Sequence, residues 1–277
     1  MYNIIVFITL LSKLGGFLMS IKMLKENALD QLKGRWGLSI GTLLTYYLIL
    51  YGTSIGINIY YSIISSINSQ YSNFEILIKL ILINNVISLF IFGVFEAGKC
   101  KFLLNITKDC HCARFIDIFS QFKIYFKVLL LSWFKIIFSL LWFVPAILVI
   151  SIPILIYIVS QPIDMIFIPQ YYFTGDNLPT TIFILISIYI IIIITIIIIN
   201  LIYSQVFYII ADNPKKSIFS CLKESRYIMK GNKFKFIILN LSFTGWFIVS
   251  ALTLGIASLW IFPYFELTKA NFYINAN

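Results

Sequence analysis

The sequence contains few charged residues and several long runs with none. Charged side chains make up 12% of the 277 residues and hydrophobic ones 60%, whereas about a quarter of a typical soluble domain is charged. Residues 181–202 read TIFILISIYIIIIITIIIINLI, which as a helix is long enough to cross the roughly 30 Å hydrocarbon core of a bilayer. The shortage of charge therefore excludes a soluble domain and predicts a multi-pass membrane protein.

Histidine is nearly absent, and this limits the chemistry that the chain can perform. His111 is the only histidine, and the sequence lacks the G-x-S-x-G, H-E-x-x-H and G-x-x-x-x-G-K-[ST] strings. The string Asp109-Cys110-His111-Cys112 spaces its cysteines more closely than structural zinc sites do. We predict no catalytic residue, no metal site and no cofactor.

Lysine and arginine are missing from two of the connections between apolar runs. Residues 56–75 and 151–180 contain neither, whereas residues 99–127 and 215–235 are rich in both. This alternation is the positive-inside pattern of membrane proteins. It predicts a bacterial inner-membrane protein whose N-terminus is cytoplasmic. The net charge of +10 is therefore expected to face anionic lipid headgroups rather than nucleic acid, and the four cysteines, all on the cytoplasmic side, are expected to stay reduced.

The first 18 residues lack the basic region that precedes the apolar run of a signal peptide. Leu14-Gly15-Gly16 can be encoded TTA GGA GGN, which contains a ribosome-binding AGGAGG core shortly before the Met19 codon. We expect residues 1–18 to be upstream sequence read as protein, and residues 19–277 to form one integral membrane domain. The gene sequence and an intact mass would test this expectation.

Five apolar segments are long enough to be membrane spans. They cover residues 38–60, 76–95, 128–150, 181–210 and 236–264. The last is too long for one untilted span, and Gly255 divides it near its middle. We therefore predict an all-α bundle of six transmembrane helices in three hairpins, with a final span over 256–270 that returns the C-terminus to the cytoplasm. The alternative is five spans.

An amphipathic segment precedes each predicted hairpin. The apolar stripes are Ile21, Leu24, Ala28 and Leu32 before the first, Phe115, Ile118, Phe119, Phe122 and Phe126 before the second, and Ile218, Leu222, Ser225 and Met229 before the third. Gly34 and Gly231 are expected to end the first and third helices, and Asn213 to cap the third. We expect all three to lie in the cytoplasmic interface and to contact anionic lipid. The predicted lipid contacts are Lys22, Lys25, Lys33, Arg35, Lys123, Lys127, Lys215, Lys216, Lys223 and Lys230.

A few polar residues lie within the apolar segments. Lys135, Asn84, Asn85 and Asn240 are the candidates for a polar path through the bundle. The asparagines, with Asn200 and Gln205, can instead be satisfied by hydrogen bonds between helices. We interpret Lys79 and Glu96, near the ends of the second segment, as side chains that reach toward the headgroups.

The chain resembles a bacterial family of multi-pass membrane proteins known as domain of unknown function nine-seven-five. The matching strings are Ala28 to Gly37, Phe95 to Gly98, Ala211 to Pro214, Glu224 to Arg226 with Met229 to Gly231, and Leu241 through Leu252-Thr253-Leu254-Gly255 to Tyr264. Members join the third and fourth spans tightly after Pro-Gly, whereas here Pro145 is followed by Ala146 and a long segment. The resemblance implies the membrane fold and brings no activity or site residues.

These patterns favour a non-enzymatic accessory or organising component of the bacterial envelope. The alternative from another class is a transporter with a polar path near Lys135, Asn84, Asn85 and Asn240. A membrane-embedded enzyme is a third possibility, and it would require titratable groups that converge in a pocket.

Overall fold

A computed structural model describes residues 2–67, 73–108, 112–141 and 178–277, and all regular structure in these ranges is helical. The chain divides into two compact units. The first comprises Met1–Trp133 and Gln205–Asn277, and the second comprises Phe134–Ser204. The all-α fold class is therefore confirmed.

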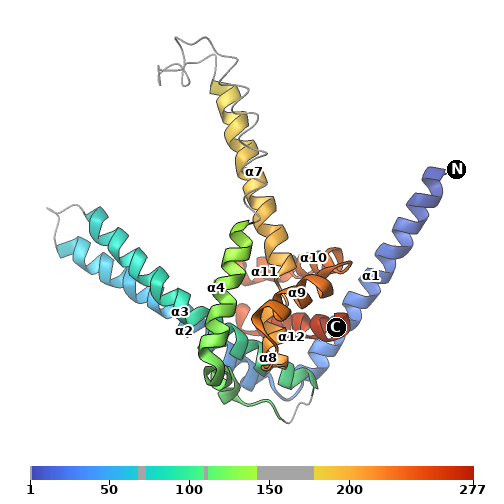
Figure 1. The fold of residues 1–277 in the computed structure, drawn as a ribbon, viewed down its shortest axis with the longest axis horizontal. Helices are drawn as coiled ribbons and strands as arrows, with labels where there is room; N and C mark the ends of the chain where they lie inside the picture. The colour runs from blue at the N-terminus through green and yellow to red at the C-terminus, as the bar shows by residue number, and fades with distance from the viewer. Residues whose placement is uncertain (1, 68–72, 109–111, 142–177) are drawn as a thin grey trace. The chain divides into compact units, whose positions relative to one another are not determined.

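The N-terminal half of the first unit consists of three long helices. They are α1 (Tyr2–Leu32), α2 (Trp36–Ile67) and α3 (Asn73–Lys108) (Figure 1). Gly34, in the turn between α1 and α2, has a φ of +74°, a backbone conformation that glycine adopts without steric cost. The predicted glycine cap at the end of the first amphipathic segment is confirmed.

The middle of the chain contains a 3-10 helix and then α4. The 3-10 helix η2 covers Phe115–Ile124, and α4 follows directly over Tyr125–Leu141. The second amphipathic segment is thus a 3-10 helix with an α-helical continuation. Asp117 fixes its start, because its Oδ2 accepts hydrogen bonds from the backbone N–H of Arg114 at 2.9 Å and from Asn105 Nδ2 at 2.8 Å.

The C-terminal part contains six helices, and two of its turns follow from the sequence. The helices are α7 (Leu178–Ile202), α8 (Val206–Asp212), α9 (Ile218–Met229), α10 (Lys233–Leu241), α11 (Thr244–Leu252) and α12 (Ser258–Ala276). Gly231 and Gly255 have φ values of +90° and +87°, as expected at the end of α9 and at the break before α12. The predicted Asn213 cap is wrong: Ser217 caps α9 by accepting from Ser220 N at 3.3 Å, and Asn213 accepts from Lys215 N in a local turn.

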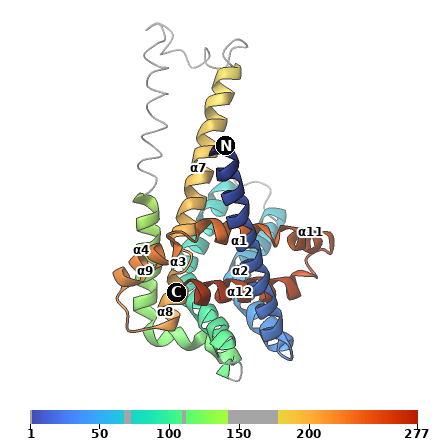
Figure 2. The same cartoon turned by 90° about the vertical axis from the view of Figure 1, so that its right-hand side faces the viewer.

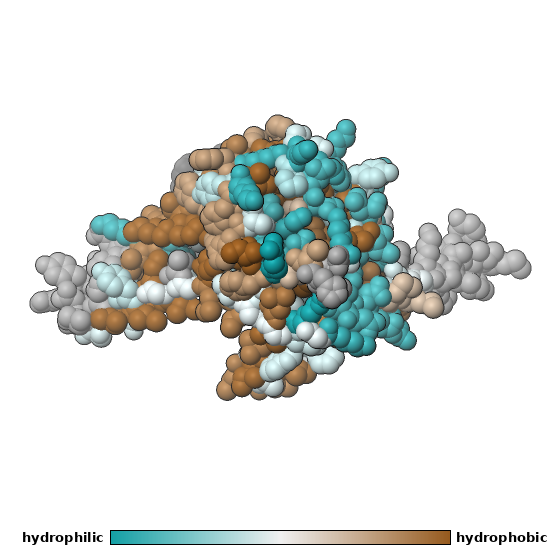
Figure 3. All heavy atoms as spheres, turned by 90° about the horizontal axis from the view of Figure 1, so that it is seen from below, coloured by the Kyte–Doolittle hydropathy of each residue, from teal (hydrophilic) through white to brown (hydrophobic). Residues whose placement is uncertain are grey.

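The first unit has a packed part and an apolar part. We call residues 21–46, 93–108, 112–132, 205–241 and 258–277 the helical head, because the buried side chains concentrate there. Residues 48–67 of α2 and 73–92 of α3 form an antiparallel pair that we call the α2–α3 arm. Figure 3 shows hydrophilic residues gathered on the head, whereas the arm, at the left of the view, is hydrophobic.

The arm has the dimensions of a transmembrane hairpin. Each of its two segments is about 20 residues long, or roughly 30 Å as a helix, which matches the hydrocarbon core. Fourteen of its large apolar side chains, between Leu48 and Ile63 and between Ile78 and Phe92, are 42–59% exposed. Such a surface is suited to contact with lipid.

Two glycines of α3 allow other helices of the head to approach α3 very closely. A Cβ added to Gly98 of α3 would lie 1.9 Å from the carbonyl oxygen of Ile118 in η2. A Cβ added to Gly93, earlier in the same helix, would lie 2.6 Å from the Oγ atom of Ser132 in α4. These two glycines bring η2 and α4 against α3, and only residues without a side chain permit that approach.

The number of membrane spans differs from the six predicted. Among the described residues, three helices are long and apolar enough to cross a membrane: Leu77–Lys108, Tyr189–Asp212 and Lys233–Leu252. A fourth candidate is α2, whose parts Trp36–Gly52 and Ser54–Ile63 meet at a bend of 43°. Residues 142–150 of the predicted third span and most of the segment 151–180 lie outside the described residues. The predicted last span coincides largely with α12, which does not meet the criteria for a span.

The apolar stripes of the amphipathic segments are buried in the protein to a greater extent than predicted. Ile21, Leu24, Ala28 and Leu32 are all at most 3% exposed, and α1 packs against α12 and α10. Leu222 and Met229 of α9 are also buried. The expectation that the first and third stripes face acyl chains is therefore wrong, since the protein itself covers them. The second segment keeps exposed aromatic side chains, Phe126 above all at 77%.

Candidate functional site

The most unusual feature of the head is a cluster of ionisable side chains in its interior. Tyr46 comes from α2, Glu96 and Lys99 from consecutive turns of α3, and Glu266 and Lys269 from consecutive turns of α12. Both pairs follow i, i+3 spacing, which places their members on one helix face. The three helices pack against one another, so they present these five residues, which we call the ionic cluster, to a single point.

The ionic cluster is joined by direct contacts. Lys99 Nζ lies 2.9 Å from Glu96 Oε1 and 3.2 Å from Glu266 Oε2. Lys269 Nζ lies 2.6 Å from Glu266 Oε1, and the Tyr46 hydroxyl donates a hydrogen bond to Glu96 Oε2. The ammonium of Lys99 also lies 4.7 Å from the centre of the Tyr46 ring. Lys99 thus bridges carboxylates of α3 and α12 while it contacts α2.

The ionic cluster is buried and electrically balanced. The side chains of Lys99 and Glu266 are only 5% and 6% exposed, and two carboxylates face two ammonium groups. Burial alone would raise the pKa of Glu266, but Lys269 and Lys99 hold the pKa of that carboxyl below its usual range. Because each charge is compensated by a partner within the cluster, the arrangement joins α2, α3 and α12.

A second set of polar contacts fixes α1 to α12 and to the residue that follows α10. Figure 2 shows α1 running across α12. Gln31 and Asn271 exchange two amide hydrogen bonds, of 3.2 and 2.8 Å, between α1 and α12. Lys25 Nζ donates to the carbonyl oxygen of Ser242 at 3.0 Å and lies 4.2 Å from the centre of the Phe243 ring. These contacts tie segments that are 240 and 217 residues apart in the chain.

Asp212 connects α8 to two other helices of the head. Its carboxylate forms an ion pair with Lys108 at the end of α3, and it accepts a hydrogen bond of 3.4 Å from the Tyr273 hydroxyl. Burial raises the pKa of Tyr273, and the adjacent Asp212 raises it further, so the phenol remains a donor. Asp212 therefore acts as a structural junction.

The residues of the predicted polar path are distributed over separate elements. Asn84 hydrogen-bonds with Ser54 of α2, at 3.0 Å from its Nδ2 to Ser54 Oγ, which confirms an interhelical role for Asn84. Its neighbour Asn85 is exposed. Asn240 of α10 donates to the carbonyl of Phe236 in its own helix. Lys135 lies in the second unit, where Ser139 donates to its carbonyl oxygen.

Two other polar residues of the apolar segments also have partners. Gln205 Nε2 lies 3.9 Å from Met229 Sδ of α9, whereas Asn200 donates to Ile196 within α7. Asn200 and Asn240 are therefore satisfied by their own helices, which corrects the expectation of interhelical bonds for both. Lys79 is exposed on the arm. The interpretation of Glu96 as reaching toward headgroups is wrong, since Lys99 and Tyr46 bind its carboxylate inside the head.

The predicted lipid contacts fall into two groups. Three of the lysines are bound within the head: Lys25 as described, Lys127 to the Pro214 carbonyl at 2.6 Å, and Lys216 to Glu224 at 2.7 Å. Arg35 is partly buried. The remaining lysines are exposed, and two of them have an acidic neighbour, because Lys22 lies 3.8 Å from Glu26 and Lys33 lies 2.6 Å from Asp30. The exposed ones without such a neighbour in the described structure are Lys123, Lys215, Lys223 and Lys230.

No potential metal site occurs in the described part of the chain, where His, Cys, Asp and Glu side chains form no group of three. Cys100 and Cys221 are buried, and Cys112 is exposed. Residues 109–111, which hold most of the string considered as a metal ligand set, lie outside the described residues.

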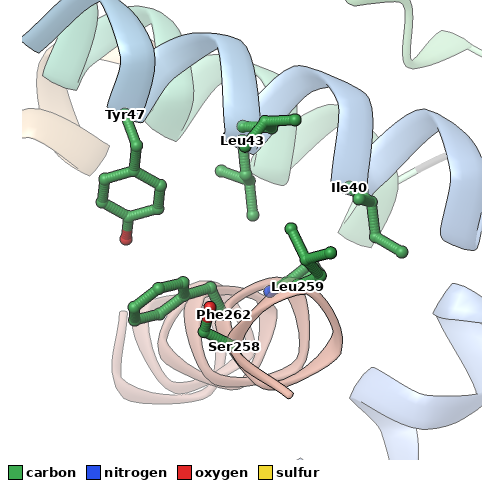
Figure 4. A pocket seen from close by; sticks show the side chains of 8 residues that line it. Ile40, Leu43, Tyr47, Ser258, Leu259 and Phe262 are labelled. Carbon is green, nitrogen blue, oxygen red and sulfur yellow. The ribbon is translucent and has the colours of Figure 1, made fainter. Parts of the chain in front are cut away.

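A small apolar groove lies where α12 crosses α2. It has a volume of about 110 Å³ and is lined by Ile40, Leu43, Leu44, Tyr47, Ser258, Leu259, Phe262 and Pro263. Figure 4 looks along the axis of α12 while α2 runs across the view, so the two helices cross instead of running side by side. The groove offers apolar contact and no convergent set of charged groups.

Sequence reasoning singled out only Glu96 among the members of the ionic cluster, as a side chain reaching toward the headgroups, and missed the cluster itself. The i, i+3 spacing of Glu96 with Lys99 and of Glu266 with Lys269 was a usable signal, because it gives each helix a paired charge on one face. What the sequence could not supply was that α3 and α12 bring these two faces together.

A family model described as "Protein of unknown function (DUF975)" matches residues 19–277, and the chain belongs to this family. The match begins at Met19, the residue at which we predict translation to start, and that start stays a prediction. No curated protein and no solved structure matches the chain.

Proposed function

We propose that this family member is a non-catalytic protein of the bacterial inner membrane that organises the lipid surface beside its cytoplasmic head. The observation that carries the proposal is the distribution of charge. Charged groups in the interior of the head neutralise one another across helices, whereas exposed lysines gather on its surface. A buried set of neutralised charges suits a rigid scaffold, and a basic surface suits an anionic partner.

Anionic lipid headgroups are the partner that this chemistry favours. Lys123, Lys215, Lys223 and Lys230 lie in the connections that the positive-inside pattern assigns to the cytoplasm. Each lysine near an anionic leaflet gains about 1 kcal/mol. The same exposed surface could attract nucleic acid, but its attachment to the apolar arm places it beside headgroups first.

The three-hairpin arrangement is the topology that we propose for this function, with both termini in the cytoplasm. The α2–α3 arm supports the first hairpin, and the antiparallel packing of α10 and α11 on α12 supports the third. The second hairpin would join α4 to α7 through residues outside the described ranges.

The bonding of Asn84 and Asn240 also favours an organising role over transport. Asn84 is bound to Ser54 and Asn240 to its own helix, so both amides already have partners. A transporter would instead need these groups to face a continuous polar path.

The proposal is tested on the full chain reconstituted in lipid nanodiscs. The native protein should unfold at a higher temperature in phosphatidylglycerol than in phosphatidylcholine, because a ligand that binds the folded state stabilises it. Replacing Lys123, Lys215, Lys223 and Lys230 with Gln should abolish most of that difference, and added salt should weaken it.

The matched control replaces Lys22 and Lys33 with Gln. These lysines are exposed, but Glu26 and Asp30 already neutralise them locally, so the double variant should retain most of the lipid-dependent difference. An undiminished difference in the fourfold variant, or an equal loss of stability in both lipids, would contradict the proposal.

A further inference from the structure

The turn between α11 and α12 presents an unusually apolar surface. Residues 236–265 contain no charged side chain, and α11 has no buried residue. We call residues 244–257 the tip. Leu252, Leu254 and Ile256, around its turn, are 79%, 94% and 64% exposed. Water does not favour a contiguous apolar surface of this kind, so the tip requires an apolar partner.

The tip alone is too short to cross a membrane, although Lys233–Leu252 as a whole has the length and hydropathy of a span. Contacts on both sides of it belong to the head: Lys235 Nζ donates to Asn275 Oδ1 at 3.1 Å, and the rings of Phe243 and Tyr264 are 4.9 Å apart. Because Lys25 of α1 binds the Ser242 carbonyl, the hairpin is fixed to the head up to Ser242. The nine residues of α11 extend only about 13 Å, against the roughly 30 Å of the hydrocarbon core.

The direction of α12 supports an orientation along the membrane surface. The first turns of α12 cross α2 at Ile40 to Tyr47 (Figure 4), immediately before the arm begins at Leu48. α2 bends by 43° between Gly52 and Ser54, so α12 lies obliquely to the arm, and it runs near the membrane surface if the arm follows the bilayer normal. The tip is then at the boundary between head and lipid, beside the first turns of α12.

The backbone of the tip is suited to a lipid environment. Gly255 N donates to Ser250 O at 2.8 Å, Ile256 N to Thr253 O at 3.1 Å, and Ser258 N to Gly255 O at 3.0 Å. Ala257 N donates to the Thr253 side chain at 3.1 Å. Because these N–H groups are satisfied within the turn, placing the turn at the edge of the hydrocarbon costs less than placing a turn with unpaired N–H groups there. Trp246 and Trp260, each 50% exposed, flank it as membrane-interface residues commonly do.

We propose that the tip inserts in the plane of the membrane, into the acyl chains of the leaflet that faces the head, so that the last block forms an in-plane hairpin and not two spans. The partner is lipid hydrocarbon. The inference rests on the proposed function in that the head is cytoplasmic, and it differs from the three-hairpin topology in that the third hairpin does not cross the membrane. The crossing helices are then α2, α3, α4 and α7.

The test measures which side of the membrane reaches position 254. Leu254→Cys, and Ile256→Cys as a second variant, are made in the full chain and treated with a membrane-impermeant maleimide in sealed vesicles of both orientations. We expect no labelling beyond that of the native chain from the outer side, and labelling from the head side at least tenfold slower than that of Cys112. Outer-side labelling would overturn the in-plane hairpin, and head-side labelling as fast as that of Cys112 would place the tip in water and overturn it as well.

A second measurement detects contact with lipid. The Leu254→Trp variant should show more tryptophan fluorescence than the native chain, and lipids with brominated acyl chains should quench this additional fluorescence. Additional fluorescence that is not quenched would overturn the inference. Failure of the underlying topology is distinguishable, because native Cys112 would then be labelled from the outer side. Correct labelling of Cys112 together with outer-side labelling at position 254 would remove the in-plane hairpin alone.

Discussion

The helical head and the α2–α3 arm share two helices, α2 and α3, but they are stabilised differently. In the head, Lys99 and Glu266 are almost fully buried and hydrogen-bonded or ion-paired across helices. In the arm, large apolar side chains are about half exposed, and Ser54 with Asn84 provides the interhelical polar pair that the described residues show. A region outside the bilayer is specified by buried polar pairs between distant segments, whereas a region inside it needs mainly length and apolar surface.

The largest effect should come from removing one charge of the ionic cluster. Lys99→Met leaves Glu96 and Glu266 buried without their shared partner, which typically costs about 3–5 kcal/mol. Thermal unfolding in detergent should show the loss. The control, Lys33→Met, breaks an exposed pair with Asp30, for which solvent screening leaves about 1 kcal/mol or less. Equal destabilisation by the two variants would mean that the cluster does not hold the head.

The next largest effect should come from adding a methyl group at Gly98. In Gly98→Ala the new Cβ meets the Ile118 carbonyl, so α3 and η2 must separate at a cost of about 1–3 kcal/mol or more. Gly41→Ala is the matched control, because a Cβ there meets nothing within 4 Å and alanine favours the helix by about 0.5–1 kcal/mol. A stability measurement in which both variants behave alike would contradict the close approach.

A smaller effect should appear on acidification. The folded-state pKa of Glu266 is lowered by Lys269 and Lys99, so its contribution to stability is full above the unfolded pKa of about 4.3 and is lost as pH falls through the lowered folded value. The unfolding temperature of the native protein should therefore fall between pH 5 and pH 3. Glu266→Gln should be less stable at pH 7 and should show a shallower fall. An identical pH profile in the variant would assign the acid sensitivity to other groups.

The smallest effect is expected in the arm. Asn84→Leu removes the bond to Ser54, and such bonds between membrane helices average about 0.6 kcal/mol. The unfolding temperature should change little, in either direction, because leucine also suits the lipid surface. A loss as large as that of Lys99→Met would show that the arm, like the head, depends on a buried polar contact.

Local features of the head were predictable from the sequence. The stripe of Ile21, Leu24, Ala28 and Leu32 is one buried face of α1, and Gly34, Gly231 and Gly255 occupy the turns assigned to them. These predictions depended on helical periodicity and on the freedom of glycine at positive φ, both of which are local properties. The sequence did not reveal what covers the stripe, since α12 lies more than 200 residues further along the chain.

The errors have related physical causes. We assigned the apolar segments as spans from hydropathy alone. Apolar residues can be buried against protein as well as in lipid, and in the head they pack against other helices. The last block was divided correctly at Gly255, but the polar contacts of Glu266 and Asn271 fix α12 to the head. Ser217, and not Asn213, caps α9. The side chain of an asparagine before Pro-Lys can either cap a helix or form a local turn, and tertiary packing decides which of the two occurs.

The central claim is that the head lies outside the bilayer, on the side of the lysine-rich connections. Native Cys112 tests it directly, because it is an exposed thiol in the head, between α3 and η2. In a Cys110→Ser background, a membrane-impermeant maleimide should modify Cys112 in inside-out vesicles and not in right-side-out ones, and adding Cys112→Ser should remove that signal. Modification of Cys112 from the outer face, or protection from both faces, would contradict the account.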